Sequence, residues 1–153
     1  MSSDRNLIIP GVGGLYRAFD GIADTLIRVA LGALLLPHGL QKLLGWFGGR
    51  GLQANTELFG KLGYNPPWLW ANIVVGTEVI GSILLIIGLW TRPAALAVGI
   101  FAFNAIIFTS GRGGFFWSNG GSEYSILLFV CAAFVMIRGA GAYSVDRAIG
   151  REF

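Results

Sequence analysis

Four apolar stretches, each about the length of a membrane-spanning helix, constrain this chain more than any other feature. The hydrocarbon core of a bilayer, about 30 Å thick, requires about 20 apolar residues in a helix. We predict such helices at Ile22–Gly45, Pro67–Trp90, Pro93–Ser110 and Ser122–Ile137, of which the last is the shortest. Apolar residues surround each helix instead of forming one stripe, which disfavours a soluble helical bundle.

The composition favours the same interpretation. Of the 153 residues, 54% are apolar and only 12% are charged, about half the charged fraction of a typical soluble protein. The net charge of +3 is scattered along the chain, whereas a nucleic-acid-binding protein concentrates basic residues in a stripe. We therefore expect a lipid bilayer as partner and no nucleic acid. The first residues, MSSDRNLIIPGVGG, are too polar for a cleavable signal peptide.

The sequence thus predicts an all-α integral membrane four-helix bundle formed by residues 22–138. Residues 1–21 are expected to form an N-terminal tail, partly amphipathic at the membrane surface, and residues 139–153 a C-terminal tail. An excess of Lys and Arg on the side of the N-terminus places both termini in the cytoplasm, with the chain in the inner (plasma) membrane. The residues on that side are Arg5, Arg17, Arg92, Arg138, Arg147 and Arg151, against Lys42, Arg50, Lys61 and Arg112 on the other.

The helix ends carry recognisable signals. Pro67 and Pro93 are expected in first helical turns, where the missing N–H does no harm. Ser122 is expected to cap the fourth helix through its hydroxyl group. The connection 46–66 contains an amphipathic stretch, NTELFGKLGY, which we expect to lie on the outer surface with Asn55 as its N-cap.

Five polar residues within the spans fall between the midplane and the outer interface. At 1.5 Å per residue, Glu78 lies near the midplane of its span, and Asn104, His38, Glu123 and Lys42 lie roughly 5 to 12 Å to its outer side. Ionisable groups in a membrane cost a few kcal/mol each, so they tend to face the bundle interior and pair. The hypothesis that follows is an outward-opening polar pocket, with Glu78, His38 and Lys42 as candidate catalytic residues and all five as candidate substrate-binding residues.

Two features of the first span support this hypothesis. His38 and Lys42 are four residues apart and therefore share one face of the helix. Pro37 cannot donate to the carbonyl of Ala33, so a kink is expected there. Glu78 lies too deep to extend to the surface, and its expected partners are Lys42 and His38.

Simpler structural roles remain open for the other members. Lys42 could extend to the outer headgroups, Glu123 could complement a helix dipole, and Asn104 could bond a neighbouring helix. Arg28, on the inner side, could pair with Asp24 four residues earlier. Small residues at helix spacing are expected to allow close packing; they are Gly32, Gly39, Gly81, Gly88, Ala95 and Gly99.

The sequence excludes several kinds of chemistry. One histidine cannot supply two haem ligands or a zinc site of the usual composition, so we expect no metal site. The single cysteine, Cys131, rules out an internal disulfide and is expected to be a packing residue. Any redox role would therefore use a diffusible carrier such as a quinone, or a cofactor on a partner, and no covalently bound cofactor is expected.

Four motifs in order along the chain resemble the DoxX family of small four-helix membrane proteins. They are RVALGALLLPHGLQKLLG (28–45), GTEVIGSILLIIGLWTRPAAL (76–96), NGGSEYSILL (119–128) and GAGAYSVDR (139–147). The resemblance implies the fold and an association with membrane redox systems, such as a thiosulfate:quinone oxidoreductase. It supplies no set of catalytic residues for this chain, whose status as an enzyme the sequence leaves undecided.

Two functional hypotheses follow. In the first, the chain is a redox-associated subunit whose pocket binds a quinone or a small substrate. In the second, it is an accessory or assembly subunit without its own activity, packed against a larger membrane protein complex. The expected protein partner is a larger membrane or redox complex, or further copies of this chain in a homo-oligomer. A proton path or carrier is disfavoured because no polar residues continue from Glu78 to the cytoplasmic face.

Overall fold

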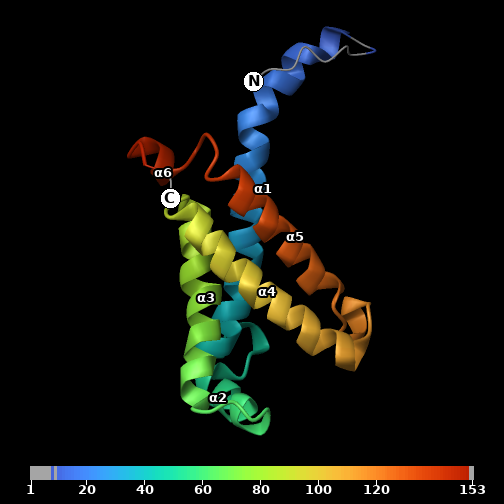
Figure 1. The fold of residues 1–153 in the computed structure, drawn as a ribbon, viewed down its shortest axis with the longest axis vertical. Helices are drawn as coiled ribbons and strands as arrows, with labels where there is room; N and C mark the ends of the chain where they lie inside the picture. The colour runs from blue at the N-terminus through green and yellow to red at the C-terminus, as the bar shows by residue number, and fades with distance from the viewer. Residues whose placement is uncertain (1–7, 9, 152–153) are drawn as a thin grey trace.

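The structure, a computed structural model, describes residue 8 and residues 10–151, and within that part it is helical without strands. Residues 1–7, 9 and 152–153, among them Arg5, lie outside the described residues. The elements, drawn in Figure 1, are η1 (Pro10–Val12), α1 (Gly13–Leu44), η2 (Trp46–Gly48), α2 (Gly51–Lys61), α3 (Pro67–Ile87), α4 (Thr91–Gly113), η3 (Trp117–Asn119), α5 (Glu123–Arg138) and α6 (Val145–Ala148).

Three helices are long and apolar enough to cross a membrane: the part Gly21–Leu44 of α1, and α3 and α4 in full. The fourth predicted span corresponds to α5, which has 16 residues and is therefore about 24 Å long. The all-helical fold with long apolar helices is thus confirmed. Many large apolar side chains, such as those of Ile80 and Ile107, face outward, as they do in a membrane protein surrounded by lipid.

The four long helices share one core. Figure 1 shows α3 beside α1, and α4 crossing between α3 and α5, while α2 lies at the far end of the molecule beside the start of α3. Leucine on α1 and small residues on α4 and α5 fill the core, so the helices approach closely. The buried cluster consists of Leu31, Leu35, Leu85, Ala94, Ala95, Val98, Ala102, Leu128, Ala132 and Val135.

Two glycines set the distance between α1 and α3. A Cβ atom at Gly32 would lie 2.6 Å from the carbonyl oxygen of Ser82, and one at Gly39 would lie 2.7 Å from Cγ2 of Val79. The prediction of close packing at these glycines is confirmed. Gly88 has a different role: it ends α3 in the left-handed conformation, with φ of 72°.

The helix ends differ from prediction in three places. The first helix begins at Gly13, nine residues before the predicted start of its span at Ile22, so residues 13–21 continue directly into that span. Asn55 lies inside α2 and is not its N-cap, because the helix already begins at Gly51. Ser122 occupies the N-cap position of α5, but its hydroxyl donates to the carbonyl of Gly114 instead of capping the helix. Pro67 and Pro93 lie in first turns, as predicted.

Arg28 joins three parts of the chain. Its side chain is fully buried, and its guanidinium donates to the carbonyls of Leu85 and Ile86 at the end of α3 and to those of Ala140 and Tyr143 after α5. The carbonyls of Leu85 and Ile86 belong to the last turn of α3 and have no intrahelical partner, and those of Ala140 and Tyr143 lie in the non-helical segment after α5. The prediction that Arg28 pairs with Asp24 is therefore wrong.

Asp24 is paired instead with Arg138, whose guanidinium donates to both carboxylate oxygens at 3.1 and 2.7 Å. A second carboxylate, Asp146, is fully buried and accepts from the backbone N–H groups of Trp90 (2.8 Å) and Thr91 (2.9 Å) at the α3–α4 turn. The backbone N–H of Asp146 donates to the carbonyl of Gly88. The segment after α5 is thus fixed to α1, α3 and the start of α4.

Candidate intramembrane polar site

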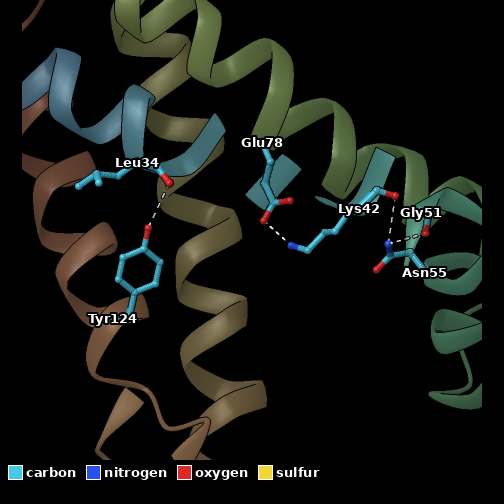
Figure 2. Close-up of polar contacts among 6 residues, drawn as sticks. All are labelled: Leu34, Lys42, Gly51, Asn55, Glu78 and Tyr124. Atoms are coloured by element: carbon cyan, nitrogen blue, oxygen red, sulfur yellow. Dashed lines mark hydrogen bonds and ion pairs between the residues drawn. The ribbon is translucent and has the colours of Figure 1, made fainter. Parts of the chain in front are cut away.

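An ion pair between Lys42 and Glu78 forms the centre of the candidate site. Lys42 lies in the last turn of α1, Glu78 lies in the middle of α3, and Figure 2 shows the two side chains reaching toward each other. The Lys42 ammonium contacts Oε1 of Glu78. The Glu78 side chain is 1% exposed and that of Lys42 is 32% exposed, so the pair is reached from outside through the lysine.

Local sequence explains why this pair forms. Gly39, one turn before Lys42, brings α1 so close to α3 that an added Cβ would lie 3.0 Å from Cβ of Glu78. A buried carboxylate needs a cation nearby, because an unpaired charge in a medium of low polarity is costly. Lys42 supplies it, and Asn55 of α2 donates to the carbonyl of Lys42 at 3.1 Å, which holds the end of α1 in place.

The pair leaves hydrogen-bonding capacity unused. Oε2 of Glu78 is buried and has no hydrogen-bond partner in the described part of the chain. The lysine ammonium carries three donors, and it lies 5.1 Å from the centre of the Phe101 ring of α4, a cation–π distance. The site therefore combines a partly exposed donor, an unpartnered acceptor and an aromatic wall.

His38 lies one turn before Lys42, and its side chain is exposed. Its ring stands 5.3 Å from the ring of Tyr124 on α5, at an interplanar angle of 41°. The Tyr124 hydroxyl donates to the carbonyl of Leu34 at 3.4 Å (Figure 2), beside Pro37, where the helix lacks one N–H donor. The α-helix nevertheless continues through Pro37 to Leu44.

The other two predicted members lie apart from the pair. Asn104 is exposed on α4, and its amide donates to the carbonyl of Ile100 one turn earlier in the same helix. Glu123, in the first turn of α5, accepts from the backbone N–H of Trp117 at 3.2 Å. The structure thus joins Lys42 and Glu78 and places His38 one turn away, while Asn104 and Glu123 have local partners.

Phe101 and Tyr124 were missed by the sequence reasoning, which searched only for charged and amide side chains. An aromatic ring at span depth in each of α4 and α5 was the available signal. Among the described residues, no group of three or more His, Cys, Asp or Glu could hold a metal ion. Cys131 is a half-buried free thiol on α5.

Comparison with known proteins gives a consistent picture. The DoxX family model matches residues 23–111. A Bacillus subtilis protein named "Putative oxidoreductase CatD" is 26% identical over 132 residues, which are 86% of this chain and 90% of the relative. The Escherichia coli "Inner membrane protein YphA" is 30% identical over 129 residues, with 78% and 85% covered.

A further relative is an uncharacterized membrane protein of Mycobacterium tuberculosis, 26% identical over 136 residues, with 82% of this chain and 80% of the relative covered. No solved structure matches the chain. The matched family region contains α3, nearly all of α4 and the apolar part of α1, and therefore both residues of the Lys42–Glu78 pair.

Proposed function

The chain belongs to the DoxX family of membrane proteins, and on that premise we propose that it is a redox-associated subunit whose Lys42–Glu78 pair binds a quinone head group or another small substrate. The observation that supports this most directly is the buried carboxylate with one unpartnered oxygen beside a partly exposed ammonium. The relative named as an oxidoreductase is consistent with a redox role.

The pair offers what a quinone ring requires. A quinone carbonyl oxygen accepts a hydrogen bond from the Lys42 ammonium, and Phe101 provides an apolar surface for the ring. Reduction of a quinone to a quinol takes up two electrons and two protons. We assign the two electrons to a redox cofactor on a partner protein and both protons to water that reaches the partly exposed Lys42. One of these protons passes through the Glu78 carboxylate, which takes it up and releases it to the nearer quinone oxygen.

Binding of a soluble quinone analogue to the purified protein in detergent tests this proposal. Glu78→Gln keeps the shape of the side chain but removes its charge, and Glu57→Gln makes the same change on the exposed face of α2. We expect Glu78→Gln to weaken binding roughly tenfold or more, because it releases the Lys42 ammonium, whose charged hydrogen bond to the quinone oxygen is worth about that much. Glu57→Gln should leave binding unchanged. Equal binding by the wild type, Glu78→Gln and Glu57→Gln would contradict a quinone site at Glu78.

We further propose that α5 is the fourth membrane span, and that both termini lie in the cytoplasm. The apolar sequence of α5, its packing against α4 and the Lys/Arg excess at the N-terminal side support this arrangement. Labelling in intact cells tests it, with Cys131→Ala as background and single cysteines at Asn119 and at Gly150. We expect an impermeant thiol reagent to label position 119 only. Labelling of position 150 from outside the cell would show that the chain has the opposite orientation.

An accessory role is the alternative, and one observation favours it. An apolar groove of about 300 Å³ runs between α4 and α5, and it is lined in part by the small residues Ala95, Gly99, Ala132 and Ala133. Such a surface admits a helix of another membrane protein at close range. Purification from native membranes in mild detergent distinguishes the roles: a stoichiometric larger partner without quinone binding supports the accessory role, and a free homo-oligomer contradicts it.

A further inference from the structure

A hollow of about 420 Å³ lies at the opposite end of the molecule from α2, where the segment after α5 folds back over the bundle. Its lining includes Arg138, Gly141, Asp146, Arg147 and Arg151. The volume falls within the range of about 300–1,000 Å³ found for small-ligand sites. Three of its lining residues are arginines, which favours an anion as the ligand.

The lining neutralises only part of the positive charge of the hollow. Its one acidic lining residue, Asp146, has both oxygens engaged with the backbone N–H groups of Trp90 and Thr91. Arg138 is paired with Asp24. The side chains of Arg147 and Arg151 are exposed, and neither has a hydrogen-bond or ion-pair partner among the described residues. Two guanidinium groups therefore remain available to a ligand.

The position of the hollow identifies the kind of anion. Arg138 is the last residue of α5, and its partner Asp24 lies within four residues of the start of the apolar span Gly21–Leu44. The hollow is therefore level with the edge of the membrane. Ile137 is 72% exposed and Ile149 is 54% exposed, so apolar surface adjoins the arginines along the chain. Guanidinium groups bind phosphate oxygens in a two-pronged geometry.

We infer that this hollow binds a phosphate-ester anion, and that its source is the headgroup of an anionic phospholipid. Basic pockets at the ends of membrane helices are suited to such headgroups. The site is separate from the Lys42–Glu78 pair, and the inference does not depend on the proposed redox role.

Native mass spectrometry of the full chain, released from detergent with defined lipids, tests the inference. The probes are phosphatidylglycerol, phosphatidylcholine and inorganic phosphate. Each arginine near a lipid surface contributes about 1 kcal/mol. We therefore expect Arg147→Gln/Arg151→Gln to weaken phosphatidylglycerol binding roughly 30-fold, while Arg147→Lys/Arg151→Lys, which keeps the charges, retains a large part of it.

The matched control is Arg50→Gln/Lys61→Gln, which removes two exposed positive charges near α2, and it should bind phosphatidylglycerol within about twofold of the wild type. Displacement of the lipid by inorganic phosphate, or binding of phosphate alone, would support the site and assign it a soluble source. The inference would be overturned if the protein retained phosphatidylglycerol and phosphatidylcholine equally and inorganic phosphate had no effect. It would also be overturned if the control variant lost as much phosphatidylglycerol binding as Arg147→Gln/Arg151→Gln.

Discussion

Replacing Arg28 by methionine removes the side chain that joins α1 to α3 and to the segment after α5. Methionine has a similar length and no donor, so the change separates hydrogen bonding from packing. The four carbonyls at Leu85, Ile86, Ala140 and Tyr143 lose their guanidinium partner. The bonds to residues 85 and 140 are buried, and the other two are partly buried.

The size of the effect follows from this burial. A buried acceptor left without a partner costs about 1–3 kcal/mol, whereas one that water reaches costs about 0.5–1.5 kcal/mol. Removing a buried charge also removes its desolvation cost, which offsets part of this loss. We expect Arg28→Met to lower the free energy of unfolding by about 3 kcal/mol. Arg28→Lys should lose about half as much, because an ammonium cannot span four carbonyls.

Unfolding by added dodecyl sulfate in mixed micelles, followed by circular dichroism, measures this difference. Arg50→Met is the control, since Arg50 is exposed and its side chain has no partner in the described part of the chain; we expect a change within about 0.5 kcal/mol. Hydrogen exchange at residues 140–146 should accelerate in Arg28→Met. If that variant unfolds like Arg50→Met and exchanges like the wild type, the guanidinium is not an anchor.

The same unfolding measurement tests three further sites. Lys42→Met should lower the free energy of unfolding by about 3–5 kcal/mol, because it leaves the buried Glu78 without its cation. The double variant Lys42→Met/Glu78→Met should recover most of that loss. If it recovers none, the two side chains are not energetically coupled. Gly39→Ala should cost about 1–3 kcal/mol, whereas Gly76→Ala, whose Cβ meets nothing within 4 Å, should stabilise α3 by about 0.5–1 kcal/mol. Asp146→Asn should cost about 1–3 kcal/mol, since only one oxygen acceptor remains for two backbone donors; an unchanged midpoint would argue against that role.

Hydropathy placed the ends of the long helices within a few residues, except for the start of the first helix, because about 20 apolar residues in a row have few alternatives to a membrane helix. Residues 13–21 are less apolar, so hydropathy did not include them in that helix. The Glu78–Lys42 pair was also predictable, since a carboxylate near the midplane needs a cation within reach. Depth alone could not show that Asn104 points outward, because depth along an axis does not determine the rotation of the helix about it.

The partners of Arg28 were not predictable in the same way. The sequence rule for helices pairs a charge with one three or four residues away, and Asp24 satisfied that rule. The true acceptors are backbone carbonyls more than 50 residues distant, and no side-chain pattern marks a carbonyl. Asp146 was missed for the same reason, because its partners are backbone N–H groups of the α3–α4 turn.

The buried guanidinium of Arg28 has a consequence for the order of assembly. It lies on the first long helix, yet two of its four acceptors, at residues 140 and 143, are synthesised more than 110 residues later. Until then this buried charge has at most the two acceptors at the end of α3. A chain cut at Gly139 would lack the other two, so the folding of the first long helix into its final contacts depends on the end of the chain.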